Sequence, residues 1–565
     1  MTEFNPALIY ILGAALTLFI PKGSLRSLFM LSIPVIAAVH FWTITPDTYG
    51  VVPFMGQNLI LMRVDALSQM FGLIFSLAAF LSIIFAWHVR DSVEHITTLL
   101  YAGATIGAVF AGDLITLFIF WEITAVASAF LVWARRTPGA YYTGLRYLVI
   151  QITSGVLLLA GAALYLRSTG SISFDRLDLA APGALFIFFA FGIKCAFPLL
   201  HNWLQDAYPA STATGAVTLS SFTTKLAVYA LARTFPGTEA LIYIGAIMAL
   251  FPIFYAVIEN DLRRVLAYSL NNQLGFMVVG IGIGTPLALN GTAAHAFCHI
   301  LYKSLLFMSM GAVLFRAGTT KGSELGGLYK SMPWTMVFCI IGAASISAFP
   351  LFSGFIAKSL ILSATADNHY VWVWFVLLFA SAGALMKVGI KIPYVAFFAH
   401  DSGIRCKEAP WNMLLAMGLT AALCIAIGVF PDPLYALLPY PVDYHPYTTD
   451  HVIAQMQLLL FSALAFGVLM KMGLYPPELR SVNLDSDWLY RRLIPGFIRR
   501  VRYGQTSASL AGITQRVTKR VETLNQTIYH SILGSNGSFA RTWRPGFMVL
   551  IIALLLTATL ALNAL

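Results

Sequence analysis

Residues 194–198 read Lys-Cys-Ala-Phe-Pro, and residues 350–358 read Pro-Leu-Phe-Ser-Gly-Phe-Ile-Ala-Lys. Both stretches lie inside long apolar runs, and proline there interrupts a helix because it cannot donate the backbone hydrogen bond. Loop counting makes the two runs cross a membrane in opposite directions, with a lysine beside each break. Paired interrupted helices of this kind are typical of inverted repeats with an ion path at the midplane. Ordinary proline kinks are the alternative interpretation.

The composition requires lipid as the solvent of this chain. Of its 565 residues, 59% are hydrophobic and only 10% are charged, with a mean hydropathy of +0.79. Soluble domains carry about 25% charged residues. The sequence therefore predicts an all-α polytopic membrane protein. The net charge of +11 does not favour nucleic-acid binding, because basic residues gather in the cytoplasmic loops of membrane proteins.

A transmembrane helix needs about 20 apolar residues. Runs of this kind recur along the chain and predict about sixteen spans. They cover residues 6–21, 27–45, 64–87, 97–111, 114–133, 146–166, 182–203, 212–234, 238–258, 265–284, 290–315, 333–362, 371–391, 411–430, 452–471 and 545–563.

The loop charges predict the orientation. Alternate loops carry the basic residues, and the loops between them carry almost none, apart from 167–181, where Arg167 and Arg176 stand beside two aspartates. The basic set is therefore expected to be cytoplasmic. No basic region precedes the first apolar run, which argues against a cleaved signal peptide. Both termini are then expected on the non-cytoplasmic side of a bacterial inner membrane. The basic loops hold Lys22/Arg26, Arg90, Arg135/Arg136, Arg263/Arg264, Arg316/Lys321/Lys330 and Arg405/Lys407.

Residues 472–544 break the pattern of spans. The segment is basic, and its apolar residues recur at three- and four-residue steps, which indicates one apolar stripe on a helix. Such a helix is too polar to span and is expected to lie along the cytoplasmic membrane surface. It would pack on lipid, on this chain or on a neighbouring subunit. The stripe consists of Leu510, Ile513, Val517, Val521, Leu524 and Ile528.

Five ionisable residues fall inside predicted spans, where a charge costs about 2.5–3.5 kcal/mol or more. They are one carboxylate and four lysines, whereas the arginines stay at loops and helix ends. Arginine keeps its proton, but a buried lysine can titrate. Arginine would serve equally well where only a permanent positive charge is needed. The use of lysine therefore favours a proton relay. These residues are Glu122, Lys194, Lys225, Lys303 and Lys358.

His295, His299 and Lys303 recur at four-residue steps and so form one stripe about 12 Å long on a helix. Two histidines and a lysine on one stripe favour a proton path, since histidine titrates near neutral pH. Packing histidines are the plainer alternative. Metal ligation is another, but no acidic or cysteine partner accompanies the pair. A sodium site would need oxygen ligands, so protons are the better fit.

Other polar residues near span ends have simpler interpretations. Asp65 and Asp113 are expected to cap helices or face the interface, and Asp261 to help anchor the topology. Lys387 and Lys391 lie at the end of a span, where snorkelling to the interface is the plain explanation, preferred for Lys391. The five cysteines show no paired spacing, so neither a disulfide framework nor a metal or iron–sulfur site is predicted.

The order of these residues resembles the antiporter-like subunits shared by respiratory complex I, membrane-bound hydrogenases and Mrp-type cation/proton antiporters. The resemblance covers about residues 60–400. It rests on Gly112–Glu122, on Lys194 with Pro198 and His201–Ala207, on Lys225 in Thr-Lys-Leu-Ala-Val-Tyr229, on Asp261–Ser269 with Gln273–Gly275, on His295–Lys303 and on Ser353–Lys358.

The resemblance implies a proton-translocating subunit of a multisubunit complex. In this scheme Glu122 tunes Lys194, Lys225 and the His295/His299/Lys303 stripe link the two halves, and Lys358 gates the exit. It implies no cofactor or metal on this chain and no enzymatic reaction by the chain alone. The expected layout is N-terminal helices at 1–95, antiporter repeats at 96–235 and 236–395, further helices at 396–471, the surface helix at 472–544 and a last span at 545–565.

The sequence departs from the family pattern at two places. Gln205 stands where the family usually has proline, and Asn271 and Asn272 replace a threonine-rich stretch. The 472–544 segment resembles the lateral helix of the distal complex I subunit, which the corresponding relatives from Mrp antiporters usually lack. Two other functions stay open: an Mrp-type sodium/proton antiporter subunit, and a scaffold that anchors a peripheral oxidoreductase or carbon-dioxide-hydrating module.

Overall fold

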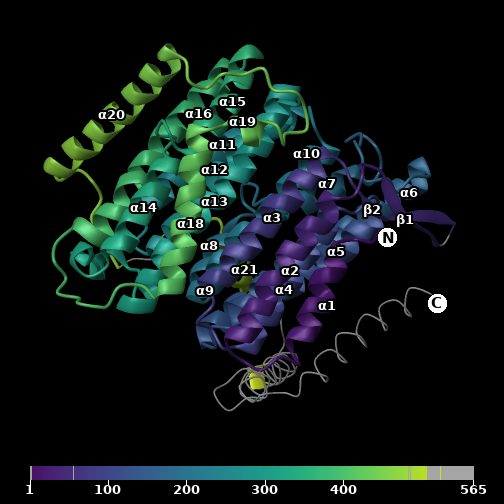
Figure 1. The fold of residues 1–565 in the computed structure, drawn as a ribbon, viewed down its shortest axis with the longest axis horizontal. Helices are drawn as coiled ribbons and strands as arrows, with labels where there is room; N and C mark the ends of the chain where they lie inside the picture. The colour runs from purple at the N-terminus through teal and green to yellow at the C-terminus, as the bar shows by residue number, and fades with distance from the viewer. Residues whose placement is uncertain are drawn as a thin grey trace.

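The computed structural model describes residues 3–54, 56–480, 483, 485–505, 519 and 522–523. This part of the chain is a bundle of helices with one β-hairpin at its edge (Figure 1). The N-terminal elements are α1 (Ala7–Thr17), α2 (Ser24–Trp42), β1 (Thr48–Phe54), β2 (Gln57–Arg63) and α3 (Ala66–Phe85).

The hairpin departs from the all-helical expectation. β1 and β2 pair antiparallel, from Thr48 opposite Arg63 to Phe54 opposite Gln57. It occupies the stretch expected as a loop, and it closes over the ends of neighbouring helices: Gly112 N donates to Ile60 O at 3.0 Å, and Arg63 N to Phe110 O at 2.7 Å. The hairpin therefore fixes the junction between the helices on either side of residues 110–113.

Two groups of helices follow, and they lie side by side in Figure 1, the first in blue and the second in teal and green. The first group is α4 (Ser92–Val109), α5 (Leu114–Trp133), α6 (Pro138–Thr169), α7 (Ala184–Lys194), α8 (Asn202–Ala210), α9 (Ala213–Ser221) and α10 (Thr223–Thr234). The second is α11 (Glu239–Ile258), α12 (Leu262–Ile283), α13 (Pro286–Ala317), η1 (Gly322–Glu324), η2 (Leu328–Lys330), α14 (Pro333–Ile346), α15 (Ser353–Asp367), α16 (Val371–Ala384), the π-helix η3 (Leu385–Ile390), α17 (Lys391–Pro393) and the π-helix η4 (Tyr394–Phe398).

The last described elements lie outside these groups. α18 packs against α13, α14 and α3, whereas α20 lies at the far edge of the bundle in Figure 1. They are α18 (Trp411–Val429), α19 (Asp432–Tyr435), α20 (Thr449–Lys471), the π-helix η5 (Leu489–Leu493) and α21 (Ile494–Gln505).

Local geometry recurs between the two groups at a spacing of 148 residues. α6 and α13 are both 32 residues long, and each begins with a proline that follows a capping threonine, Thr137 or Thr285. Each ends at a glycine in the left-handed region, Gly170 with φ 74° and Gly318 with φ 77°. Because proline suits the first helical turn and glycine the position after the last, these signals set equal helix lengths.

The two proline breaks share one backbone conformation. Ala196 and Leu199 have φ values of 61° and 69°, and Ala348 and Leu351, 152 positions later, have 57° and 73°. At each break a backbone N–H reaches back five residues, from Phe197 to Gly192 O and from Phe349 to Ala344 O, both at 3.0 Å. Pro198 and Pro350 lack the donor for a fourth-residue bond, so helices α7 and α14 end as the sequence predicts.

Nine helices in the described residues are long and apolar enough to cross a membrane, and three shorter apolar helices accompany them. The chain is thus a helical membrane protein. The predicted spans up to residue 471 coincide with helices or with helices joined by a break. The expected span at 545–563 lies outside the described residues, so the count of about sixteen stays a prediction.

α13 is the central helix of the bundle. It packs against α3, α9, α10, α12, α14, α15 and α18, and 94% of its most apolar 18-residue window is buried. Its polar residues His295, His299 and Lys303 are consequently fully buried as well. They do not face lipid.

The loops predicted to be cytoplasmic meet on one face. Arg135 and Arg263 both donate to Pro209 O, Arg316 Nε donates to Glu408 O at 2.9 Å, and Lys330 pairs with Asp401 at 3.2 Å. We call this surface the basic face. Its assignment to the cytoplasm stays a prediction.

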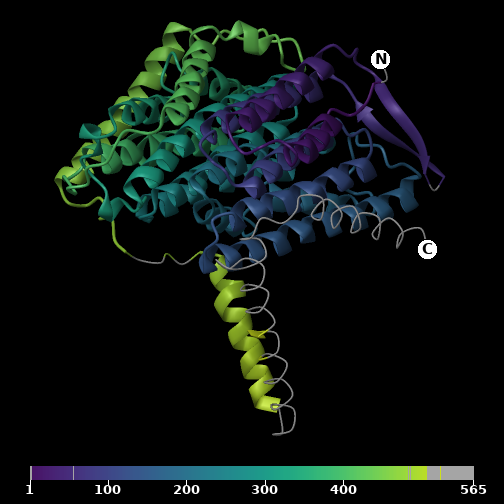
Figure 2. The same ribbon diagram turned by 60° about the horizontal axis from the view of Figure 1, so that its bottom comes forward.

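The segment after α20 begins differently from the expected surface helix. Residues 475–480 form neither helix nor strand, and Glu478 and Arg480 pair with bundle residues on the basic face. α21 then projects away from the bundle (Figure 2). The apolar stripe from Leu510 to Ile528 lies outside the described residues, so the lateral helix and its clamping role stay predictions.

Arg263 shows how the basic face is held together. The guanidinium is fully buried and donates to four backbone carbonyls at the end of α8, those of Tyr208, Pro209, Ser211 and Thr212. Backbone N–H groups also reach Tyr208 O and Thr212 O, and Arg135 also reaches Pro209 O. The arginine therefore acts as a shared cap that joins the end of α8 to the start of α9. The residue expected only to set topology therefore also stabilises the fold.

Arg263→Leu should destabilise the protein strongly, because the buried junction of α8 and α9 loses a charged group that donates to four carbonyls. We expect the free energy of unfolding to fall by about 3 kcal/mol or more, given about 1.5–3 kcal/mol for a hydrogen bond to a charged group. The measurement is thermal unfolding of the purified protein in detergent. Arg264→Gln is the matched control, since Arg264 is partly exposed and its contact to Glu259 is 3.9 Å. Equal stability of the two variants would contradict the capping role.

Candidate functional site

The first broken helix places Lys194 against α5. Its Nζ donates to Trp121 O at 2.6 Å and to Thr124 Oγ1 at 3.0 Å, and it lies 4.3 Å from the Trp121 ring centroid. The side chain is fully buried. The carboxylate of Glu122, the next residue on α5, is an electrostatic neighbour of this ammonium. Glu122 and Lys194 are therefore brought together, as the sequence predicted.

Glu122 is held in a notch on α6. A Cβ added at Gly155 would lie 1.4 Å from Glu122 Oε1, so only glycine leaves room for the carboxylate. Oε1 is buried and has no hydrogen-bond partner among the described residues, although the residue as a whole is half-buried. The position of this carboxylate thus depends on the packing of α5 against α6.

Lys225 lies at a second interruption. α9 ends at Ser221 and α10 starts at Thr223, and the distortion leaves Ser220 O to accept from Lys225 Nζ at 2.6 Å. The lysine is fully buried, and the Cys195 thiol beside the first break is its electrostatic neighbour. Lys225 therefore connects the surroundings of Lys194 to those of α13.

The histidine stripe on α13 joins a hydrogen-bonded chain toward α12 and α11. His295 Nε2 lies 3.3 Å from Tyr302 Oη, which donates to Gln273 Oε1 at 3.2 Å. Gln273 Nε2 donates to Asn272 Oδ1 at 2.7 Å, and Asn272 in turn donates to Ala249 O. The rings of His295 and His299 are 6.0 Å apart and nearly parallel.

Three groups in this central region lack any hydrogen-bond partner among the described residues: both ring nitrogens of His299, Lys303 Nζ and Lys387 Nζ. All three side chains are fully buried. Lys303 has Lys225, Lys358 and Lys387 as charged neighbours, so these lysines form one cluster rather than isolated sites. A buried cation without acceptors is costly, which is unusual for a purely structural residue.

Lys358 replaces a missing backbone donor at the second break. Its Nζ donates to Ile346 O at 2.6 Å. In an unbroken helix that carbonyl would accept from residue 350, which is proline here and has no N–H. Lys358 also lies 5.3 Å from the Phe276 ring centroid, and the His295 ring centroid is 5.9 Å from the same ring. Lys358 therefore adjoins the histidine stripe.

The expectation that Lys391 snorkels is wrong. Its side chain is fully buried and donates to three carbonyls at the end of α11, those of Ala256, Val257 and Glu259, at 2.7–3.2 Å. Its fourth partner is the Glu478 carboxylate at 3.0 Å. The unpaired carbonyls of a helix end attract a cation, so Lys391 caps α11 instead of reaching the interface.

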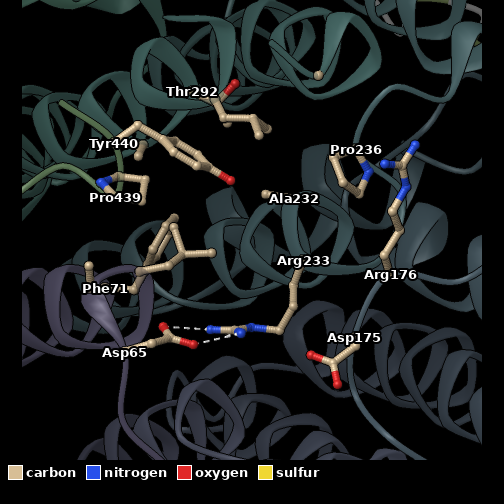
Figure 3. A pocket seen from close by; sticks show the side chains of 15 residues that line it. Asp65, Phe71, Asp175, Arg176, Ala232, Arg233, Pro236, Thr292, Pro439 and Tyr440 are labelled. Carbon is tan, nitrogen blue, oxygen red and sulfur yellow. Dashed lines mark hydrogen bonds and ion pairs between the residues drawn. The ribbon is translucent and has the colours of Figure 1, made fainter. Parts of the chain in front are cut away.

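A pocket lies at the C-terminal ends of α10 and α12, and Figure 3 shows the side chains that line it. It has a volume of about 470 Å³ and is lined by charged residues and by Thr292 of α13, one turn before His295. Arg233 pairs with Asp65 at 2.8 Å, and Arg63 with Asp175 at 2.6 Å. Asp65 also caps α3 through Ser68. Its predicted capping role is thus combined with an ion pair.

Asp113 and Asp261 are capping residues too. Asp113 accepts from Ile115 N and Thr116 N, and Asp261 accepts from Arg263 N. In the part of the chain that the structure describes, no three histidine, cysteine or acidic side chains are grouped to hold a metal ion.

Sequence reasoning gave several polar residues near the site no role in it. Lys387 lies inside a π-helix, an element that often marks functional positions but leaves no pattern in hydropathy. Tyr302 and Gln273 are ordinary helix residues until the packing of α12 on α13 joins them. Glu94 is buried near the start of α4 and accepts from Thr214 and Thr212. Because Glu94 lies at the end of a predicted span, the sequence analysis did not single it out.

Comparison with known proteins agrees with this geometry. Residues 111–384 match the family described as NADH:quinone oxidoreductase/Mrp antiporter, transmembrane. Subunit M of the F(420)H(2) dehydrogenase of Methanosarcina mazei is 30% identical over 458 residues, which cover 74% of this chain and 90% of that one. One subunit of the Na(+)/H(+) antiporter of Alkalihalophilus pseudofirmus is 28% identical over 510 residues, 79% of this chain and 61% of the relative's length.

A solved structure shares the fold over almost the whole chain. A subunit of the membrane-bound sulfane sulfur reductase, an archaeal respiratory membrane complex, superposes with a TM-score of 0.71 at 22% identity, covering 98% of this chain and 99% of that one. The 30% identity to the subunit M relative, over 90% of its length, shows that the chain belongs to the transmembrane family shared by NADH:quinone oxidoreductases and Mrp antiporters.

Proposed function

We propose that this chain moves protons across the membrane as a subunit of a multisubunit complex. The observation that carries the proposal is the row of buried titratable side chains through the middle of the bundle. The row starts at Glu122 and Lys194, continues through Lys225 and the stripe of His295, His299 and Lys303, and reaches Lys358. Lys387 belongs to the same cluster by its charged neighbours.

The hydrogen bonds of these lysines support titration rather than a fixed charge. An ammonium offers three donors, yet Lys225 and Lys358 each have one acceptor, Lys194 has two, and Lys303 and Lys387 have none among the described residues. Burial disfavours the charged form, and these few acceptors offset it only in part. We therefore propose that these lysines lose and regain a proton, as a relay needs.

The proposed path begins at Glu122 and Lys194. A change in their separation or hydration loads or releases a proton on Lys194, because the Coulomb term and the desolvation term are of similar size. Lys225 takes the proton onward to the histidine stripe, where an imidazole accepts it at one nitrogen and releases it from the other. Lys358, at the second break, controls release.

We further propose that the repeated helix lengths and the two matching breaks reflect two inverted repeats, with the path at their junction. In such a fold the breaks lie near the midplane. The basic face would be cytoplasmic in a bacterial inner membrane. About sixteen spans and a surface helix over the stripe at 510–528 would complete the architecture.

The partners are proposed to be other integral membrane subunits, since two relatives are named as subunits of a dehydrogenase and of an antiporter. Sodium/proton antiport of the Mrp type is the second candidate, supported by the antiporter relatives. Proton flux that requires sodium on the opposite side would favour it. A scaffold with no transport would not need the buried lysines, each of which costs free energy.

Lys194→Arg should stop transport, because arginine keeps the charge but does not release its proton at relevant pH. We expect proton flux to fall by about a hundredfold or more. The measurement is uptake of protons into proteoliposomes that contain the purified complex, driven by an imposed membrane potential. Lys391→Arg is the matched control, since its site holds a fixed cation with four oxygen partners.

Retention of most of the flux in Lys391→Arg and its loss in Lys194→Arg would support the assignment. Normal flux in Lys194→Arg, with full assembly, would make Lys194 a structural cation and the proposed mechanism wrong.

Gly155→Ala tests the placement of Glu122. The added Cβ would overlap Oε1, so the carboxylate has to move away from its present position beside Lys194. We expect flux to fall about tenfold or more while the complex still assembles, since a misplaced catalytic group is costly. Gly418→Ala, where the nearest atom is 3.5 Å from the new Cβ, should leave flux unchanged. An unaffected Gly155→Ala variant would remove Glu122 from the path.

A further inference from the structure

The segment after α20 reaches into both halves of the bundle. We call its described residues 475–480, 483 and 485–488 the strap. Glu478 pairs with Lys391 of the second group at 3.0 Å, and Asn483 Nδ2 donates to Glu259 Oε2 at 3.3 Å. Asp485 contacts His201 of the first group. The strap therefore crosses the basic face from one group of helices to the other.

Asp485 is the strap residue that enters deepest beside the proposed path. One carboxylate oxygen lies 3.2 Å from His201 Nε2 and accepts from Tyr268 Oη at 2.7 Å. The other accepts from Ser486 N at 2.6 Å. The side chains of Asp485 and His201 are only 7% and 3% exposed. A carboxylate and an imidazole thus meet at the start of α8, just after the first helix break.

The surrounding charges have partners of their own. Glu259 pairs with Arg264 at 3.9 Å, and Asp487 with Arg491 at 3.0 Å. The Tyr255 ring stacks on that of Tyr268 at 5.2 Å. Among the described residues, His201 is the one basic side chain that Asp485 contacts directly.

Two opposing effects act on this acid. Burial raises the pKa of Asp485, but hydrogen bonds from His201 and Tyr268 outweigh it and hold the pKa below its ordinary value. Burial, followed by the charge of Asp485, raises the pKa of Asp487. The charged form of Asp485 is thus stabilised mainly by the imidazole that would take a proton from it.

Buried polar atoms without partners lie on α8 and α6, the helices that adjoin His201 and Glu122. His201 and Gln205 are four residues apart at the start of α8, and Gln151 and Gly155 are four apart on α6, which packs against α8. Residues at this spacing share a helix face, and Gly155 touches the Glu122 carboxylate. His201 Nδ1 and both amide groups of Gln205 and Gln151 have no partner among the described residues.

We propose that Asp485 and His201 form the site where protons enter from the basic face on their way to Glu122 and Lys194. The Asp485 carboxylate takes a proton from solvent and passes it to His201 Nε2. The imidazolium then releases the proton on Nδ1 toward Glu122 and becomes neutral again, so no net charge stays on the histidine. The inference rests on the proposed function and adds a residue from outside the two groups of helices.

A static latch between strap and bundle predicts different behaviour. In that case the pair only fixes the strap, and transport does not depend on whether residue 485 binds a proton. Asp485→Asn separates the two roles, because asparagine keeps the size and an oxygen that accepts from Tyr268 but does not take up a proton near neutral pH.

The test measures proton flux through the purified complex in proteoliposomes under an imposed potential, between about pH 6 and about pH 8. Without the acid, hydronium has to reach His201 directly, and its concentration falls tenfold per pH unit. Asp485→Asn should therefore lower flux about tenfold or more near pH 8 and much less near pH 6. Asp485→Glu should restore most of the flux.

Asp487→Asn is the matched control, because it removes the same charge from the same strap but leaves the contact with His201. It should leave the pH profile unchanged. Flux in Asp485→Asn equal to wild type at every pH would overturn the uptake role. So would a parallel loss at every pH accompanied by detachment of the strap, detected as new protease cleavage between residues 472 and 485.

Failure of this inference is distinguishable from failure of the proposed function. If Lys194→Arg abolishes flux while Asp485→Asn leaves it intact, transport stands and the uptake site is wrong. If the wild-type complex shows no proton flux, the proposed function fails, and the uptake site fails with it.

Discussion

The pairing of buried lysines with backbone carbonyls freed at helix breaks is the interaction on which this structure depends. Proline at 198 and 350 removes a backbone donor inside an apolar run, and an unpaired carbonyl there costs free energy. At the second break the ammonium of Lys358 takes the place of the missing N–H on Ile346 O. The distorted turn between α9 and α10 does the same with Lys225 and Ser220 O. Each break therefore requires a polar group nearby, and it also holds the lysine that supplies that group in place.

Hydrogen-bond satisfaction separates two kinds of lysine in this bundle. Lys391 has four oxygen partners and stands at a helix end, where a permanent cation is favoured. Lys303 and Lys387 have none among the described residues, although both are fully buried. In the sequence these three lysines look the same, because each lies in or next to an apolar run. Only the packing distinguishes a lysine that caps a helix from a buried lysine without acceptors.

The sequence predicted what depends on local chemistry. Pro198 and Pro350 predicted the breaks, and helical spacing placed His295, His299 and Lys303 on one buried stripe. The prediction that Lys391 snorkels was wrong because the carbonyls that accept its hydrogen bonds belong to α11, more than 130 residues earlier in the chain. The contact between His201 and Asp485 spans 284 residues and has no periodicity to reveal it. The hairpin was missed because its strands lie in a stretch expected as a loop.

The two breaks share a backbone conformation but hold their lysines differently, and this difference bears on how each could respond. Lys358 bonds to the end of its own interrupted helix, so its surroundings change only if that break bends. Lys194 bonds instead to the backbone of α5, a separate helix that also carries Glu122. Its surroundings change whenever α5 moves against α6 or α7. Glu122, on the same helix, is half-buried. The hydrogen bonds of Lys194 therefore depend on how α5 packs against its neighbours, whereas the hydrogen bond of Lys358 depends on the geometry of the break itself.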